Sequence, residues 1–259
     1  MVALVMIRQH RRETKRLSNQ VRNTFATIAL TSLLATIGAY AADCPVAPQP
    51  HIPPVAVTPF NLDFVKNALT DYHDNGTYMA DIAAVYSTAR PYVESRAGEV
   101  KKPAVVLDID ETSLSNWPNL QADNFGFIPK GPCTLEKDFA CGFTAWVELG
   151  TAKEIPPALE FFKAVRAKNV AVLFITARKE SQRGITEKNL HAVGYDGWET
   201  LVLLPDGDKS TSQAFKTAAR QKLASEYTIL ANIGDQLSDL AGGSAECTFK
   251  LPNPFYFIP

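Results

Sequence analysis

Four short apolar runs, each bounded by polar or glycine residues, are the most regular feature of the chain. Runs of this length that are rich in β-branched residues are typical of buried strands. The first run ends abruptly in Asp108 and Asp110, two carboxylates separated by one residue. The predicted strands are Pro103–Asp110, Val170–Ile175, Leu201–Leu204 and Tyr227–Ile233.

Between these runs, apolar residues recur at helical spacing. Helices are predicted over Pro156–Lys168, Ser181–Ala192 and Ser212–Ser225. The two prolines at 156 and 157 suit a first helical turn, and Gly194 suits a helix end. Strands that alternate with helices of this length specify a parallel sheet with right-handed crossovers. We therefore expect an α/β fold, a Rossmann-like parallel sheet that is flanked by helices.

The residues before the first strand divide into two parts. Residues 42–60 are rich in proline and lack periodicity, which predicts an extended lead-in segment. From Asn61 to Ser95 apolar residues return at helical spacing, with a break at Asn75-Gly76. We expect two helices there that pack on the core, so that the folded domain spans residues 61–259.

Residues 113–154 interrupt the alternation of strands and helices. This segment has no clean period and carries several aromatic residues, among them Trp117, Phe125 and Trp146. It is interpreted as an insertion or small cap over the end of the first strand. These aromatic rings, and Trp198 further along, could stack on an aromatic ester or a nucleotide base, but packing in a small core explains each of them equally well.

The first 41 residues have the character of a secretory signal. Six basic residues precede an uncharged stretch from Thr24 to Ala41, which closes with Ala39-Tyr40-Ala41. A basic region, an apolar region and small residues at a cleavage site define such signals. The apolar stretch is shorter than the roughly 20 residues of a spanning helix, which disfavours an uncleaved anchor. We expect cleavage after Ala41 and export to the periplasm or the medium, with no membrane span afterwards.

The charge of the chain changes once that signal is removed. Residues 1–41 hold six of the 26 basic and one of the 27 acidic residues, so the mature chain carries a net charge near −6. An acidic surface argues against binding of a nucleic-acid polymer through its phosphates. An anionic substrate would have to be held by a local cation.

All four cysteines lie beyond the predicted signal, an even number in an exported chain. Disulfides are therefore the leading interpretation. The sequence allows three pairings; Cys133 with Cys141 would close a short loop, and Cys44 with Cys247 would complete the set. A zinc site is the alternative, although the paired spacing that zinc favours is missing. A lipid anchor on Cys44 is disfavoured because Asp43 stands directly before it.

Carboxylates follow two of the predicted strands. Asp108 and Asp110 end the first strand, and Asp235 with Asp239 follows the fourth. Because the carboxyl ends of parallel strands share one edge of a sheet, these groups should meet there. Clustered carboxylates repel one another at low dielectric and need a cation, and oxygen ligands alone favour Mg²⁺ over zinc.

A magnesium ion on carboxylates commonly also binds phosphate oxygens, which suggests a phosphoryl-transfer site. Asp108 would attack phosphorus, and Asp110 would act as general acid and then base. Thr176, which ends the second strand before a predicted helix, would offer a hydroxyl. Lys216 on the third helix would supply a positive charge. Each residue alone is weak evidence, and their order after successive strands strengthens the interpretation.

Taken together, these motifs resemble those of the haloacid dehalogenase-like phosphatases, in the acid phosphatase branch that includes bacterial non-specific acid phosphatases and plant vegetative storage proteins. The resemblance runs from about Asn61 to the end of the chain. The segments that carry it are Asp108-Ile109-Asp110-Glu111-Thr112 with the following Ser113 to Asn116, Thr176-Ala177-Arg178-Lys179-Glu180, Lys216 with Arg220, Gly234-Asp235-Gln236-Leu237-Ser238-Asp239-Leu240, and the ending Phe249 to Tyr256.

The resemblance implies a role for each matching residue. Asp108 would be the nucleophile and Asp110 the acid/base, and both would bind Mg²⁺, Asp110 through its backbone carbonyl. Asp235 would complete the metal site, with Asp239 beside it. The further expected catalytic residues are Thr176 and Lys216, and the expected substrate-binding residues are Thr112, Ala177 and Arg178.

Two positions leave alternatives. Ala177 stands where this branch would have glycine, which restricts the approach of the backbone to a phosphate. Lys209 also lies between the third strand and the last motif, and it competes with Lys216 for the role of phosphate-binding lysine; Arg220 favours Lys216.

Three functions share these residues. The leading one is an exported, magnesium-dependent acid phosphatase that hydrolyses small phosphate monoesters. The second is a storage or binding protein on the same scaffold, which an aspartate at the nucleophile position disfavours. The third is a phosphotransferase that uses an alcohol in place of water.

Overall fold

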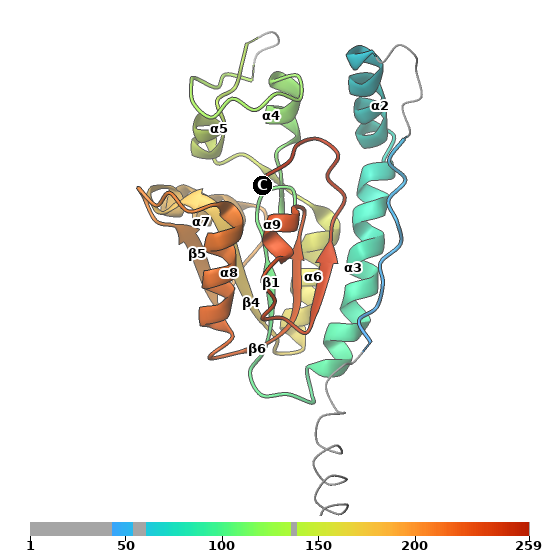
Figure 1. Cartoon of the computed structure of the whole chain (residues 1–259), viewed down its shortest axis with the longest axis vertical. Coiled ribbons are helices and arrows are strands. Elements are labelled where there is room, and N and C mark those ends of the chain that lie inside the picture. Colours follow the sequence, from blue (N-terminus) through green and yellow to red (C-terminus); the bar gives the residue numbers. More distant parts are fainter. Residues whose placement is uncertain (1–42, 54–60, 136–138, 259) are drawn as a thin grey trace, which may run out of the picture. The chain divides into compact units, whose positions relative to one another are not determined.

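The central sheet contains the four strands that the apolar runs predict, and one more. The computed structural model describes residues 43–53, 61–135 and 139–258. The strands of the sheet are β1 (Pro103–Leu107), β4 (Ala171–Lys179), β5 (Thr200–Leu204), β6 (Thr228–Gly234) and β7 (Cys247–Lys250). They lie in the order β5-β4-β1-β6-β7 and every neighbouring pair is parallel (Figure 1). The predicted α/β fold with a parallel sheet is confirmed.

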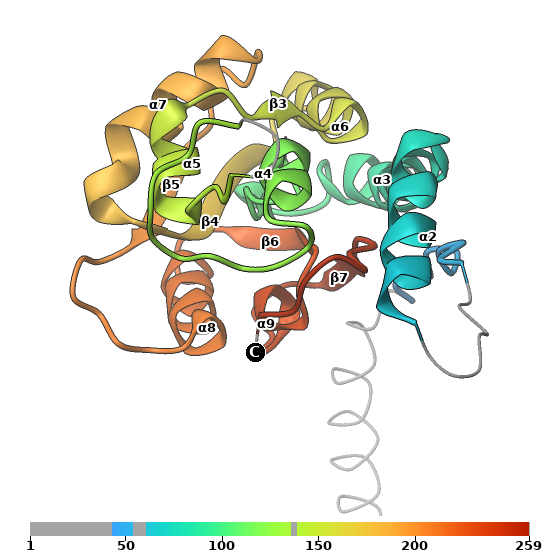
Figure 2. The same cartoon turned by 90° about the horizontal axis from the view of Figure 1, so that it is seen from above.

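Alternate residues of the strands pack into two separate hydrophobic clusters. Val105 and Leu107 of β1 belong to the larger cluster, which includes residues of α3 and α6, whereas Ala104 and Val106 belong to a smaller one with residues of α8. The view from above shows α3 and α6 on one side of the sheet and α8 on the other (Figure 2). Both faces are therefore covered, as a parallel sheet requires. In the second half of the chain, three helices alternate with the strands: α6 (Pro156–Ala167), α7 (Arg183–Ala192) and α8 (Ser212–Leu223).

Two helices precede the sheet, as predicted. They are α2 (Leu62–Asp74) and α3 (Thr77–Arg96). Gly76 separates them with a φ of 83°, a left-handed conformation that glycine adopts without a steric penalty. The break at Asn75-Gly76 thus ends one helix and starts the next.

The described part of the lead-in, residues 43–53, forms no helix or strand and is fixed at two points. Cys44 forms a disulfide with Cys247 at the start of β7. His51 contacts the buried Asp81 of α3, with 2.5 Å between Nδ1 and Oδ1. The predicted signal and residues 54–60 of the lead-in lie outside the described residues. Within the described residues, no helix has the length and apolar character that a membrane crossing needs.

Residues 113–154 leave the sheet just beyond the end of β1 and return before α6. Their base is a pair of short antiparallel strands, β2 (Leu114–Ser115) and β3 (Lys153–Glu154). Two short helices follow from this base, α4 (Trp117–Ala122) and α5 (Phe143–Leu149). A second disulfide joins Cys133 to Cys141, so all four cysteines pair as disulfides and the zinc alternative is wrong.

The strand ends differ from the predicted ones. β1 stops at Leu107, before Asp108 and Asp110, and Glu111 beyond them adopts a left-handed φ of 52°. β4 runs on to Lys179, since its pairing with β5 skips from Thr176 to Lys179 and leaves a bulge between them. A 3₁₀ turn, Glu180–Gln182, then precedes α7. Thr176, which was predicted to end its strand, therefore lies inside β4, and the predicted helix Ser181–Ala192 corresponds to α7, which begins at Arg183.

Candidate active site

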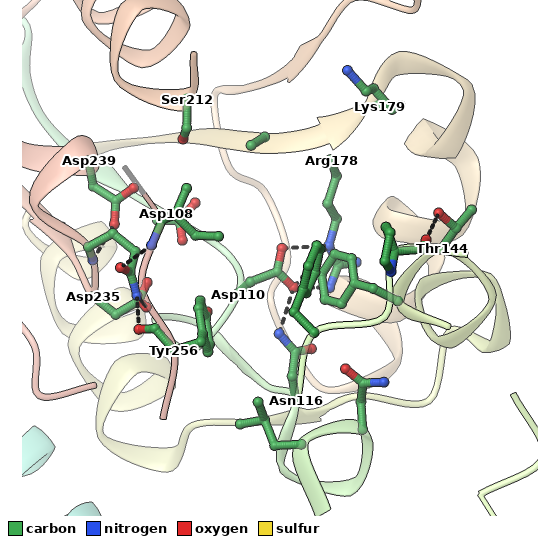
Figure 3. A pocket seen from close by; sticks show the side chains of 18 of the residues that line it. Asp108, Asp110, Asn116, Thr144, Arg178, Lys179, Ser212, Asp235, Asp239 and Tyr256 are labelled. Atoms are coloured by element: carbon green, nitrogen blue, oxygen red, sulfur yellow. Dashed lines mark hydrogen bonds and ion pairs between the residues drawn. The ribbon is translucent and has the colours of Figure 1, made fainter. Parts of the chain in front are cut away.

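Three buried carboxylates gather at the carboxyl ends of two adjacent strands. Asp108 directly follows β1, Asp235 directly follows β6, and Asp239 lies in the short helix α9 (Leu237–Leu240). Each offers an oxygen within 4.8 Å of the other two, and Figure 3 shows them together on one side of the pocket. A Cβ on Gly234 would lie 2.5 Å from the Asp239 carboxyl, so only glycine permits this close approach. The expected meeting of Asp108, Asp235 and Asp239 is thus observed.

Lys216 joins two of these carboxylates. Its ammonium donates to Oδ1 of Asp108 and to Oδ1 of Asp239, both at 2.6 Å, and the side chain is buried. Burial alone would lower the pKa of Lys216, but the two carboxylates raise it above its ordinary value. Arg220, one turn later in α8, donates to the carbonyl of Asp239 and fastens α9 to the same helix. Lys209 is exposed and does not line the pocket, so the structure places Lys216, and not Lys209, in the site.

The donor set suits a hard divalent cation. Three carboxylates and one ammonium leave an excess of negative charge in a place that water hardly reaches. Burial, reinforced by Asp239, raises the pKa of Asp235 to about 6. Burial also raises the pKa of Asp108 well above its ordinary value, although Lys216 opposes this. A cation bound by oxygen atoms would relieve this crowding, and carboxylate oxygens are the ligands that Mg²⁺ or a similar ion prefers.

Asp110 lies beside this cluster in a different environment. Arg178 contacts both of its oxygens, with 2.7 Å from Nη2 to Oδ1 and 3.1 Å from Nε to Oδ2. The amide of Asn116 donates to the same carboxylate at 3.0 Å. Burial alone would raise the pKa of Asp110, but Arg178 and Asn116 more than offset it and hold the pKa below its ordinary value. The pKa values of the two aspartates of the D-x-D motif are therefore shifted in opposite directions, upward for Asp108 and downward for Asp110.

The remaining predicted residues lie partly in the pocket and partly behind it. Ala177 and Arg178, in the bulge of β4, line the pocket. Thr176 is fully buried behind them, and its hydroxyl accepts a hydrogen bond from the Arg178 N–H at 3.2 Å. Thr112 is also fully buried, and its hydroxyl donates to Asp235 at 3.2 Å. Neither threonine lines the pocket, so their expected contacts with a substrate stay predictions.

The pocket beside the carboxylates has a volume of about 280 Å³. Its polar lining includes the carboxylates, Lys216, Arg178 and several uncharged side chains, among them Asn116 and Gln236. Residues 113–154 supply another part of the lining, which includes the apolar side chains Leu120, Phe127 and Phe143. Two residues of the C-terminal segment, which we define as residues 251–258, complete the wall: Tyr256 and Ile258.

Three tryptophans that the sequence left open between substrate stacking and core packing lie outside the pocket. Trp146 is buried and donates its Nε1–H to Asn116 at 2.8 Å. Trp117 stacks on His73 of α2, with 3.6 Å between the ring centroids. Trp198 packs edge-on against Phe174 of β4. None of these three lines the pocket, so core packing accounts for them.

Sequence reasoning missed a buried carboxylate next to the site. Glu111 is fully buried and accepts hydrogen bonds from the Tyr78 hydroxyl, at 2.6 Å, and from the backbone N–H of Asn116. Burial raises its pKa to about 7 in spite of these bonds. Its place directly after Asp110 was a signal in the sequence, but Tyr78 lies 33 positions earlier and nothing local identifies it as a partner.

A parallel α/β sheet with buried carboxylates and a lysine at its carboxyl edge defines a protein class suited to metal-assisted phosphoryl transfer. Comparison with known proteins gives the family. The chain belongs to the HAD superfamily, subfamily IIIB (acid phosphatase), whose family model matches residues 51–259. The predicted family and enzyme class, a phosphomonoesterase of the acid phosphatase type, are confirmed.

Individual relatives agree with this assignment. The chain is 36% identical to the stem 28 kDa glycoprotein of Glycine max over 197 residues, which cover 74% of each chain. It is 33% identical to acid phosphatase 1 of Solanum lycopersicum over 200 residues, or 76% of this chain and 74% of the relative. Among solved structures, the tungstate-bound class C acid phosphatase of Bacillus anthracis superposes with a TM-score of 0.57 at 24% identity, covering 74% of this chain and 86% of that one, which supports the fold.

Proposed function

We propose that the protein is an exported, magnesium-dependent phosphatase that hydrolyses small phosphate monoesters through an aspartyl-phosphate. The observation that carries this proposal is the arrangement around Asp108. Its carboxylate ends β1 at the floor of the pocket, with Lys216 bonded to one oxygen and Asp235 and Asp239 within reach of a shared cation. Asp110 lines the same pocket.

The first half of the reaction forms a bond between an Asp108 oxygen and phosphorus while the ester bond breaks. Asp110 gives its proton to the departing oxygen. Lys216 offsets the charge on the phosphoryl oxygens. A bound Mg²⁺, held by Asp108, the Asp110 carbonyl and Asp235 with Asp239 nearby, would draw negative charge from the phosphoryl group and keep Asp108 ionised.

In the second half, Asp110 takes a proton from a water molecule, which attacks phosphorus and releases inorganic phosphate and free Asp108. The lowered pKa of Asp110 keeps its carboxylate ionised, which is the form that can take this proton. The acid step needs the protonated form, which becomes more abundant as the pH falls. The arrangement thus favours activity on the acid side of neutrality.

The substrate is proposed to be a small monoester, because the cavity of about 280 Å³ holds a phosphate and a modest organic group. Residues 113–154 would act as the cap, since they supply Leu120, Phe127 and Phe143 to the wall. Thr112, Ala177 and Arg178 are proposed to bind the substrate, Ala177 through the backbone that the bulge exposes. The excess of acidic residues argues against a nucleic-acid polymer.

Phosphate release from p-nitrophenyl phosphate tests this proposal. Mature protein treated with a chelator should release no phosphate between about pH 4 and 8, and Mg²⁺ should restore release. Asp108→Asn should abolish turnover while the fold persists. Asp81→Asn is the matched control, because Asp81 is also buried but lies outside the pocket. Full activity of Asp108→Asn would remove the nucleophile assignment.

The alternatives have separate tests. A storage or binding protein would release no phosphate from any of a panel of monoesters in the presence of Mg²⁺. A phosphotransferase would convert an added alcohol into its phosphate ester, which product analysis detects. Export is tested by the N-terminal residue of the protein recovered outside the cytoplasm, which should be Ala42.

A further inference from the structure

Two side-chain amides connect Asp235 to the C-terminal segment. Asn253 donates its Nδ2–H to Oδ2 of Asp235 at 2.6 Å, and Gln236 donates its Nε2–H to the same oxygen at 2.7 Å. The amide oxygen of Asn253 accepts from the N–H of Phe255 at 2.9 Å, and that of Gln236 accepts from the N–H of Ile258 at 3.0 Å. Each amide therefore joins a carboxylate of the site to the backbone of the C-terminal segment.

The orientation of both amides follows from chemistry. A backbone N–H can only donate, so the amide oxygen must face it, and the NH₂ group must then face Asp235. A carboxylate can only accept, which makes the arrangement complementary at both ends. Oδ2 of Asp235 thus receives two short bonds, while Oδ1 accepts a longer bond of 3.2 Å from Thr112.

The same bonds fix the wall of the pocket. Tyr256 and Ile258, which line it, follow Asn253 by three and five residues. The Tyr256 N–H also approaches the Asn253 oxygen at 3.4 Å, and the Ile258 carbonyl accepts from Ser238 at 3.2 Å. The position of this wall therefore depends on the amides that hold Asp235.

We propose that Asn253 and Gln236 are positioning residues that couple the orientation of the metal-binding carboxylate Asp235 to the pocket wall made by Tyr256 and Ile258. This inference rests on the proposed function, because it assigns Asp235 to the metal and the wall to the organic group of the ester. Gln236 lines the pocket beside Asp235, whereas Asn253 does not line it. They act through the carboxylate on one side and through the backbone on the other.

Loss of one amide has two expected effects. With one donor removed, the Asp235 carboxylate keeps a single amide partner and its orientation toward a cation is held less firmly. Partners of this kind affect metal affinity by about 10- to 100-fold. The backbone of the C-terminal segment also loses an acceptor, which loosens Tyr256 and Ile258. A large organic group, which reaches this wall, should lose more binding than a small one.

The experiment compares wild type with Asn253→Ala and Gln236→Ala. Mg²⁺ is titrated into chelator-treated mature protein in a calorimeter, a readout that needs no activity. The KM values for 1-naphthyl phosphate and ethyl phosphate are then measured with saturating Mg²⁺. Asn189→Ala is the matched control, because the buried Asn189 amide also bonds on both sides, to the N–H and the carbonyl of Ala152, but contacts no carboxylate of the site.

We expect both test variants to weaken Mg²⁺ binding at least about tenfold and to raise KM for naphthyl phosphate more than for ethyl phosphate. The control should keep the wild-type Mg²⁺ affinity and the wild-type ratio of the two KM values. Wild-type Mg²⁺ affinity in both test variants would overturn the inference, and so would weakened Mg²⁺ binding with an unchanged KM ratio.

Two further outcomes keep the test decisive. Circular dichroism reports whether each variant is folded, and if Asn253→Ala does not fold, Gln236→Ala carries the same comparison. A wild-type protein that binds Mg²⁺ but cleaves no ester would end the proposed function, whereas weakened Mg²⁺ binding in the variants would still support the link to Asp235. A wild-type protein that binds no Mg²⁺ would overturn the inference.

Discussion

Replacement of Glu111 by glutamine should change how the stability of the metal-free protein depends on pH. Glu111 is fully buried and bonded to the Tyr78 hydroxyl, and burial raises its pKa from 4.5 to about 7. Glutamine has nearly the same shape but does not titrate. The variant therefore removes one titration and leaves the packing almost intact.

The sign follows from proton binding. Between about pH 4.5 and 7 the native protein holds a proton on Glu111 that the unfolded chain has released, so the free energy of unfolding falls as the pH rises through this range. A pKa difference of about 2.5 corresponds to about 3 kcal/mol. For a chain of this size that is roughly 6–12 °C in Tm.

Urea unfolding in the presence of a chelator, at pH 4.5 and 7.5, measures the effect. Asp235, whose pKa is about 6, titrates in both proteins, so the difference between them reports mainly on Glu111 and on its repulsion with Asp235. This difference should shift by about 3 kcal/mol in favour of the variant at the higher pH. Glu160→Gln, an exposed helix position, is the control. If wild type and variant differ in free energy of unfolding by the same amount at both pH values, the reasoning is refuted.

Three further predictions concern the pocket. Lys216→Met should reduce phosphate release by at least about 10³-fold and destabilise the metal-free protein by about 3–5 kcal/mol, because two buried carboxylates lose their partner. Lys209→Met, the control, should change neither quantity. Equal effects of the two substitutions would contradict this prediction. Arg178→Met removes the cation that lowers the pKa of Asp110, so the pH profile of kcat/KM should move to higher pH. An unchanged pH profile would count against Asp110 as the general acid. Phe143→Ala should raise KM for aryl phosphates by about 10-fold with little change in kcat, while a matching fall in kcat would mean that the ring supports the chemistry and not the binding.

Several features of the fold were predictable because they depend on local patterns. The apolar runs gave four of the five strands, since a buried strand must be apolar over its own length. The strand β7 was missed because Cys247–Lys250 is short and alternates buried with exposed residues. The end of β4 was also missed, because Thr176 to Lys179 continues the strand through a bulge that only its pairing with β5 reveals.

The candidate site was predictable to the extent that its residues follow strand ends. The meeting of Asp108, Asp235 and Asp239 follows from the alignment of the carboxyl ends of parallel strands. Lys216 could be preferred to Lys209 only because Lys216 together with Arg220 resembles a family motif. The exact partners of Asp110 could not be derived, because Arg178 reaches it across 68 positions of sequence.

The sequence by itself therefore determined four strands of the sheet, the helices between them and the carboxylates that follow two of these strands, because periodicity and the residues at a strand end are local properties. The tertiary structure alone decided which of these groups touch. It set Arg178 against Asp110, turned Thr176 behind the pocket, buried Glu111 against Tyr78, and attached Asp235 to the C-terminal segment through Asn253. Such contacts depend on distance and burial in the folded chain, and these determine the charge and orientation of each group.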